Sequence, residues 1–306
     1  MKSTPLILYV PGLLPKPIPG THRDALFRCL LAGLRRYDEQ VALDLAQNLH
    51  CFDVIAWTYD FYGQHRDFAT DAAAVDAVIE QPGPTERDLR EADTWSRRIA
   101  RRLFMIADVL PFLIRHVANE RMELHLRDLL RYLGNRNGIA DHARNMLKIG
   151  LRAAAGSERP ILLLTHSMGS VIAWDSPWQM THVDRDDVEI DLLVTMGSPL
   201  GQHFIQKRLY GHGEAGARRY PGIVRDWVNL SAVGDLTALD PGLADDFAEM
   251  VELGLVAGIR DERLHNWFRL AGELNVHAEY GYLANDATAR VVGDWWRLRR
   301  RLCSDG

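Results

Sequence analysis

Short apolar runs recur along the chain and predict the strands of a buried sheet. Four of them, each ended by Gly, Pro, Ser or Asp, are Leu6–Val10, Val54–Tyr59, Ile161–Thr165 and Asp191–Thr195. A fifth candidate strand is Val224–Leu230. Continuous apolar runs of this length are typical of strands that helices cover on both faces.

Helical patterns separate these strands. In Arg23–Asn48, for example, Leu, Phe and Val recur at helical spacing. Alternation of strands and helices is typical of a parallel sheet with helical crossovers. We therefore predict an α/β fold with a mostly parallel central sheet and helices on both faces.

A long segment between the second and third predicted strands interrupts the alternation. It holds about ninety residues, whereas a plain crossover needs only about a dozen. Thr94–Arg115 and Asn119–Leu133 have strong helical patterns within it. We predict one domain over residues 1–306 with a helical insertion at 64–158, a candidate cap or lid. The alternative is a set of ordinary helices that cover the sheet.

The C-terminal stretch Ala287–Leu302 predicts a last helix. Val291, Trp295 and Leu298 form an apolar stripe that lies beside several arginines. One interpretation is a helix that binds a membrane surface or a partner. The other is a helix docked on the sheet by its tryptophans, with its arginines in solvent.

Composition and charge limit the classes of partner. Of 306 residues, 47% are hydrophobic and 25% charged, as in ordinary globular proteins. The formal net charge of −5 gives no support to nucleic-acid binding, which favours a basic balance. The sequence leaves the oligomeric state open.

Cysteine usage and the N-terminal residues predict a cytoplasmic protein. Cys29, Cys51 and Cys303 are odd in number and far apart, which fits a reducing compartment better than a disulfide framework. The apolar run before Pro11 is too short for the core of a signal peptide. No run reaches the roughly 18 apolar residues of a membrane span, so we expect no integral membrane segment.

The segment Arg159–Asp175 joins an apolar strand to an apolar helix through the turn T-H-S-M-G. A serine hydroxyl is a poor nucleophile unless it is exposed, strained into place and next to a base. A tight strand-to-helix turn would lift the Ser167 hydroxyl above the sheet edge. Gly169 fits this turn, because the backbones approach closely there. The alternative is a serine that only caps the helix.

This turn resembles the G-x-S-x-G nucleophile elbow of the α/β-hydrolase superfamily, in its lipase and esterase branches. Thr165 stands where the first glycine usually is. Asp191–Gly201 also resembles the strand and turn that follow the elbow helix in that family. The resemblance covers residues 1–62 and 158–302, and it implies that Ser167 is the nucleophile of a serine hydrolase.

The resemblance also implies an oxyanion hole. Backbone donors aimed at the charged oxygen of an acyl transition state are worth roughly 3–4 kcal/mol each. One would be the N–H of Met168, the residue after the nucleophile, and the other would follow an early strand. The run Val10–Leu13 has the P-G that lipases often carry there, with Leu13 as the preferred donor and Leu14 as the alternative. Without the elbow, P-G would be read as a strand-ending turn.

The remaining triad members follow from the superfamily order of Ser, then Asp or Glu, then His. Asp235 and His277 lie in surroundings that resemble the D-x-x-A and H-x-x-Y patterns near the ends of lipase chains. Histidine titrates near neutral pH, so His277 would take and return the Ser167 proton. Asp235 would orient the imidazole. Asp240, five residues on, is a rival acid.

Several other residues compete for these roles. The rival histidines are His203, His182 and His65. None of the three lies late enough for the superfamily order. Ser198 follows a strand, but Pro199 lacks the N–H that an oxyanion donor would need there. His166 is interpreted as structural, because its place at the strand end points it away from Ser167.

The sequence thus predicts a serine hydrolase that cleaves carboxylic esters through an acyl-enzyme on Ser167. The implied substrate is a small-molecule or lipid ester with an apolar acyl chain, and helices between Trp95 and Leu133 are candidates for its pocket. The alternatives are a thioesterase, acyltransferase or amidase with the same triad, or a non-catalytic binding protein of this fold. Neither metal-ligand spacing nor a phosphate-binding glycine loop is present in the sequence, so we expect no cofactor.

Overall fold

A six-stranded parallel sheet forms the centre of the computed structural model, which describes residues 4–95, 97, 99 and 120–304. The strands are β1 (Leu6–Val10), β2 (Phe52–Val54), β3 (Ile161–His166), β4 (Leu192–Met196), β5 (Trp227–Ala232) and β6 (Ile259–Leu264). Their order is β2-β1-β3-β4-β5-β6, and every neighbouring pair is parallel. The predicted α/β fold with a parallel central sheet is confirmed.

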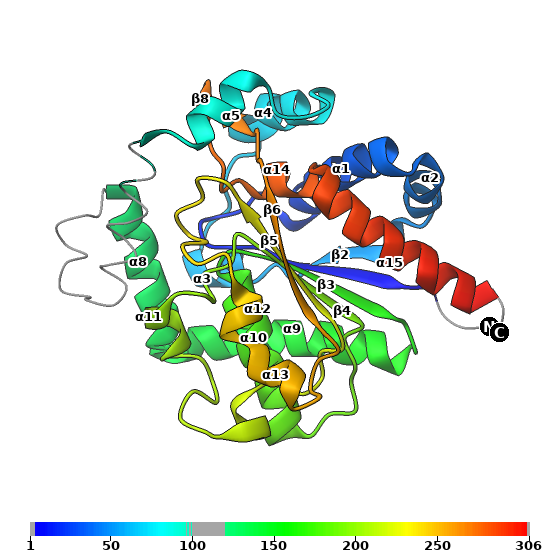
Figure 1. Ribbon diagram of the computed structural model, residues 1–306, viewed down its shortest axis with the longest axis vertical. Coiled ribbons are helices and arrows are strands. Elements are labelled where there is room, and N and C mark those ends of the chain that lie inside the picture. The colour runs from blue at the N-terminus through cyan, green and yellow to red at the C-terminus, as the bar shows by residue number, and fades with distance from the viewer. Residues whose placement is uncertain (1–3, 96, 98, 100–119, 305–306) are drawn as a thin grey trace.

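Helices cover both faces of this sheet (Figure 1). One face holds α1 (Pro19–Tyr37), α2 (Glu39–Gln47), α14 (Glu279–Leu283) and α15 (Asp286–Ser304). The other holds α9 (Ile139–Gly156), α10 (Gly169–Gln179), α12 (Leu243–Asp246) and α13 (Ala248–Glu252). Side chains alternate along each strand, so Ile7 packs in the first core and Leu8 in the second.

The second predicted strand, Val54–Tyr59, is wrong over most of its length. β2 ends at Val54, and Thr58–Tyr62 forms the helix α3. Trp57 and Phe61 are four residues apart, and their rings meet edge to face at 5.4 Å. The helical spacing of Trp57, inside the apolar run, and Phe61, after it, therefore outweighs the likeness of the run to a strand.

The predicted helix Arg23–Asn48 is two helices, α1 and α2. Asp38 separates them with an extended backbone, and its carboxylate accepts the Val41 N–H at 3.2 Å. This is an N-cap contact, which begins a new helix in a different direction.

The strand β6 was not predicted, and β5 lies later than the predicted Val224–Leu230. Val224 makes only an isolated bridge to Ile190, and regular pairing begins at Trp227. β6 lies at the edge of the sheet and carries mostly charged, partly exposed residues. An edge strand need not be apolar on both faces, so it lacks the pattern that marks the buried strands.

Between β2 and β3 the described residues are mainly helical. After α3 come α4 (Ala69–Glu80), α5 (Glu86–Ala92), α8 (Glu120–Leu133) and α9. Leu147 and Leu151 of α9 pack in the sheet core, so the last helix of this segment covers the sheet directly. Most of the predicted helix Thr94–Arg115 lies outside the described residues, as does much of the candidate acyl pocket. The division at residues 64–158 stays a prediction.

Shorter elements complete the described chain. They are the 3₁₀ turns η1 (Leu49–Cys51), η3 (Arg136–Gly138) and η5 (Gly216–Arg219), the π turn η4 (Met180–Asp184), the helix α11 (His203–Gln206), and the hairpin β7 (Arg269–Leu270) and β8 (Glu273–Leu274).

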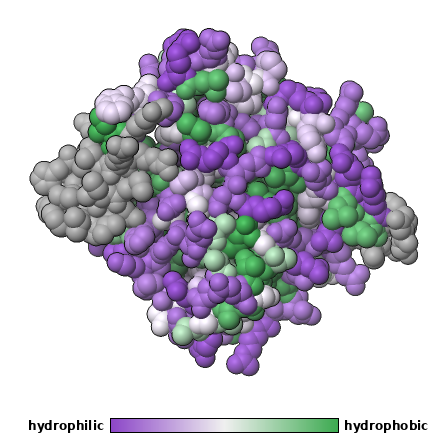
Figure 2. Space-filling model, viewed as in Figure 1, coloured by the Kyte–Doolittle hydropathy of each residue, from purple (hydrophilic) through white to green (hydrophobic). Residues whose placement is uncertain are grey.

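The last helix, α15, is docked by its tryptophans. Trp296 is buried, and its indole N–H donates to Asp44 of α2 at 2.8 Å. The arginines are not simply in solvent: Arg300 pairs with Asp44 at 2.9 Å, and Arg297 pairs with Asp38. Hydrophilic residues cover most of the face on which α15 and β6 lie, with small apolar groups among them (Figure 2).

Candidate functional site

The site is built where four parallel strands end at the same edge of the sheet. Ligands of open α/β sheets bind at the carboxyl ends of the strands. The loops that leave β1, β3, β4 and β5 carry Leu13, Ser167, Gly197 and Asp235. In Figure 1 these ends of the strands point towards the side of the molecule where α8 and α11 lie.

Ser167 occupies a left-handed backbone conformation between β3 and α10. Its φ is 53°, and its N–H still donates to Met196 O of β4 at 2.9 Å. A left-handed non-glycine residue costs roughly 1–3 kcal/mol and persists where surrounding structure enforces it, often at active sites. The sheet thus holds Ser167 in a strained turn directly ahead of a helix.

Two glycines allow the first loop to lie against this turn. A Cβ on Gly169 would stand 2.2 Å from Val10 O, and a Cβ on Gly12 would stand 2.7 Å from the Ser167 Cβ. Neither position has room for a side chain. The close approach predicted at Gly169 is confirmed, and the loop after β1 lies beside Ser167.

Three backbone N–H groups near Ser167 differ in whether they have an acceptor: those of Leu13 and Leu14 in the loop after β1, and that of Met168 after the serine. The Leu14 N–H donates to the Tyr62 hydroxyl at 2.9 Å, so it is already engaged. For Leu13 and Met168, the described residues provide no acceptor for the N–H. Both residues are buried, and backbone N–H groups in buried residues are usually paired, so two such donors beside a strained serine suit an anionic oxygen. This difference favours Leu13 over Leu14.

Asp235 and His277 come together across 42 residues of chain. His277 Nδ1 lies 2.8 Å from Asp235 Oδ2. The aspartate side chain is fully buried, while a quarter of the histidine side chain is exposed. Because the ionised carboxylate can only accept, Nδ1 carries the proton and the Nε2 lone pair is left for the site.

Further donors hold Asp235 in its ionised form. Oδ2 accepts from the Tyr282 hydroxyl at 2.8 Å, and Oδ1 accepts from the Thr237 N–H at 2.9 Å. Burial by itself would raise the pKa of Asp235, but His277 and these donors lower it below its usual value. Asp235 is therefore a fixed negative charge behind the imidazole.

Gly197 fits closely around the Asp235–His277 pair. It follows β4 with a φ of +56°, and a Cβ there would stand 2.8 Å from Asp235 Oδ2 and 3.1 Å from His277 Nδ1. Sequence reasoning quoted Gly197 only as part of a resembling turn and missed this contact. It also gave no role to Tyr282, which binds Asp235 and lies two residues after Tyr280, the tyrosine of the H-x-x-Y pattern.

The serine and the histidine are not hydrogen-bonded to each other in this structure. Within the described part of the chain, no hydrogen bond joins the Ser167 hydroxyl to His277. Catalytic hydrogen bonds of free enzymes are often long and tighten only in the substrate complex.

The rival candidates lie in other contacts. Asp240 Oδ1 accepts from the Gly242 N–H, so its carboxylate caps a turn. His182 bonds the Tyr220 carbonyl, and His65 stacks on a tyrosine. His203 lies in α11. Ser198 is buried, and its hydroxyl accepts from the Leu200 N–H at 3.2 Å.

His166 packs directly against His277. Their ring centroids are 4.6 Å apart, and the His166 Nε2–H donates to the His277 carbonyl at 2.8 Å. Its other nitrogen, Nδ1, is buried without a partner. Burial, with a smaller effect of His277, lowers the pKa of His166 to about 3. His166 is thus a neutral support for the loop that carries His277.

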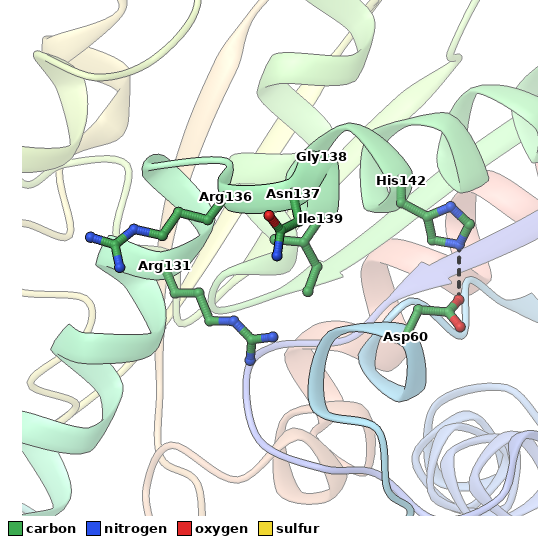
Figure 3. Close-up of a pocket in the computed structure, with 7 residues that line it drawn as sticks. All are labelled: Asp60, Arg131, Arg136, Asn137, Gly138, Ile139 and His142. Atoms are coloured by element: carbon green, nitrogen blue, oxygen red, sulfur yellow. Dashed lines mark hydrogen bonds and ion pairs between the residues drawn. The ribbon is translucent and has the colours of Figure 1, made fainter.

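None of these residues lines the cavity of about 660 Å³ that Figure 3 shows. Its lining residues are Asp60, Arg131, Arg136, Asn137, Gly138, Ile139 and His142. Asp60 and His142 face each other at 2.9 Å, whereas the guanidinium groups of Arg131 and Arg136 point in different directions. The arginines do not converge on one ligand atom, so this cavity carries no argument for a second site.

Two further kinds of site are absent from the described residues. Residues 4–95, 97, 99 and 120–304 contain no cluster of His, Cys, Asp and Glu that could hold a metal ion. In the same part of the chain, no helix is both long and apolar enough to cross a membrane.

Comparisons with known proteins leave the family open. The resemblance to α/β-hydrolases rests on the sequence motifs given above. The fold and the site geometry are separate observations. The chain matches no model of a protein family, no curated protein and no solved structure.

Proposed function

We propose that this protein is a serine hydrolase that cleaves carboxylic esters through an acyl-enzyme on Ser167. The observation that carries the proposal is the buried Asp235–His277 pair at 2.8 Å, at the same sheet edge as a serine in a left-handed strand-to-helix turn. A binding protein of this fold needs neither the pair nor the strained serine. Their combination is the arrangement of nucleophilic catalysis.

His277 is the general base in this mechanism. Its Nε2 takes the Ser167 proton as the hydroxyl attacks the ester carbonyl, and then gives that proton to the leaving alkoxide. Asp235 keeps Nδ1 protonated and stabilises the imidazolium that forms. Water then attacks the acyl-enzyme by the same route and releases the acid. Ser167 and His277 have to come within hydrogen-bond reach when the substrate binds.

The N–H groups of Leu13 and Met168 stabilise the negative oxygen of each tetrahedral intermediate. Two such donors account for roughly 6–8 kcal/mol of transition-state stabilisation if each contributes its usual amount. α10 begins immediately after Met168, so the positive end of its dipole adds to the same field.

The test is covalent labelling together with ester turnover. Wild-type protein is expected to react with a fluorophosphonate probe and to hydrolyse 4-nitrophenyl esters. Ser167→Ala is expected to lose labelling and to lower kcat by about 10³-fold or more, because the nucleophile is gone. The readouts are mass spectrometry of the labelled peptide and release of 4-nitrophenol.

Ser198→Ala is the matched control, because Ser198 is also a buried serine in a turn that follows a strand. It is expected to keep labelling and turnover. Failure of folded wild-type protein to react with the probe would contradict the proposal and favour a binding protein. Parallel assays with acyl thioesters and amides then separate an esterase from a thioesterase or amidase.

A further inference from the structure

Resting on the proposed function, we infer that Glu279 is a positioning residue that joins the oxyanion loop to the loop that carries His277. The oxyanion loop is defined here as residues 11–18, between β1 and α1. Glu279 begins α14, two residues after His277. Its carboxylate binds donors that flank and lie within the oxyanion loop.

Three donors converge on this carboxylate. The Tyr9 hydroxyl donates to Oε2 at 3.0 Å, while Lys16 Nζ and His22 Nε2 donate to Oε1 at 2.9 and 3.0 Å. Tyr9 lies just before the oxyanion loop, Lys16 inside it and His22 just after it. The strand before the loop, the loop itself and the helix after it are therefore tied to a single group.

The network is buried and charged. The side chains of Glu279 and Lys16 are 6% and 14% exposed, and Tyr9 is fully buried. Burial alone would raise the pKa of Glu279, but Lys16 and His22 hold it well below its usual value. An ionised carboxylate in a buried place accepts strong, directional hydrogen bonds.

The network has a consequence for the proposed reaction. Leu13 lies three residues before Lys16, and His277 lies two residues before Glu279. The oxyanion donor and the base must reach the same carbonyl group, from opposite ends of the chain. The Lys16–Glu279 contact fixes one loop against the other, and displacement by about 1 Å can lower kcat by about 100-fold.

The experiment replaces Lys16 and follows hydrolysis of 4-nitrophenyl butyrate by full-length protein. Lys16→Met removes the charge and keeps most of the side-chain length. We expect kcat to fall about 10- to 100-fold with KM changed less than about twofold, because the substrate still binds while the reacting groups are misaligned. Lys16→Arg restores a donor and is expected to recover most of the loss.

Lys148→Met is the matched control. Lys148 pairs with Asp184 at 2.9 Å, and its side chain is 10% exposed, so the same substitution breaks a pair of equal length at a lysine of similar burial. Among the described residues, no hydrogen bond or ion pair joins Lys148 to a site residue, so Lys148→Met is expected to keep wild-type kcat. Circular dichroism and thermal melting establish the folded fraction of each variant.

The possible results separate this inference from the proposed function. Unchanged kcat in folded Lys16→Met, a rise in KM alone, or an equal loss in Lys148→Met would overturn the positioning role. If Lys16→Met does not fold, Tyr9→Phe decides: a smaller loss of kcat supports the role, and wild-type kcat contradicts it. If wild-type protein does not react with fluorophosphonate, the proposed function fails first, and the inference falls with it.

Discussion

The absence of one atom, a Cβ on residue 197, allows Asp235 and His277 to form their hydrogen bond. Gly197 leaves space for their contact only because it has no Cβ. Ser167 has the opposite character, since it keeps a side chain in a conformation that favours glycine. The site therefore needs glycine at position 197, where a side chain would not fit. It keeps serine at position 167 although the backbone conformation there is strained.

Gly197→Ala tests the first of these requirements. The added methyl group would displace the Asp235–His277 pair, so we expect kcat for ester hydrolysis to fall about 10- to 100-fold. Gly254→Ala is the matched control, since Gly254 is also left-handed, at φ +68°, but has open space around it. Both variants should lose about 1–2 kcal/mol of stability, and only Gly197→Ala should lose activity. Equal kcat values in the two would contradict the steric argument.

His166 predicts a pH dependence of stability. Its pKa is about 3 in the folded protein, below the value near 6.5 of an unfolded histidine, so the unfolded state binds more protons between these limits. The stability that neutral His166 provides is complete above pH 6.5 and decreases as pH falls towards 3. Between pH 6.5 and pH 5 the loss amounts to about 2 kcal/mol.

Urea unfolding of wild-type protein and of His166→Gln at both pH values measures this effect. Glutamine retains an N–H donor for the His277 carbonyl but does not titrate. The variant is therefore expected to lose less stability than the wild type on acidification. Parallel losses in the two proteins would show that another group is responsible.

At the scale of elements, the contacts between neighbouring helices decide where each one begins and ends. Asp38 accepts the Val41 N–H at the start of α2 and also pairs with Arg297 of α15. One residue thus separates α1 from α2 and ties both to the last helix. The apolar periodicity of residues 23–48 carries no sign of this break, because it depends on a cap.

Asp38→Ala is expected to lower the free energy of unfolding by about 1–2 kcal/mol, because α2 loses its cap. Asp38→Asn keeps a capping oxygen and loses only a partly exposed ion pair, so its expected loss is below about 1 kcal/mol. Denaturant unfolding of both variants makes the comparison. Equal losses would assign the effect to Arg297 rather than to the cap.

For the whole molecule, the buried strands are the part that the sequence predicts best. β1, β3 and β4 lie within one residue of their predicted bounds, because strands covered on both faces are continuously apolar. β6 escapes prediction because its exposed edge carries charge. The end of β2 was predicted wrongly because a short apolar run is compatible with both a strand and a helix.

The candidate site divides in a similar way. Sequence order and resemblance select Ser167, Asp235 and His277, and the structure brings the last two together. The contact of Lys16 with Glu279 joins residues 263 positions apart, and no local pattern marks it. Such contacts exist only after β1 and the end of the chain have reached the same sheet edge.

The two outer strands make this sheet a poor template for a neighbouring molecule. In β2, which has three residues, the Val54 N–H donates to the Asp53 carboxylate and the Phe52 carbonyl accepts from Arg23. At the opposite edge, β6 presents Arg260 and Arg263 to solvent. Chains that approach edge to edge meet occupied backbone groups on one side and guanidinium charges on the other, which disfavours fibrillar aggregation.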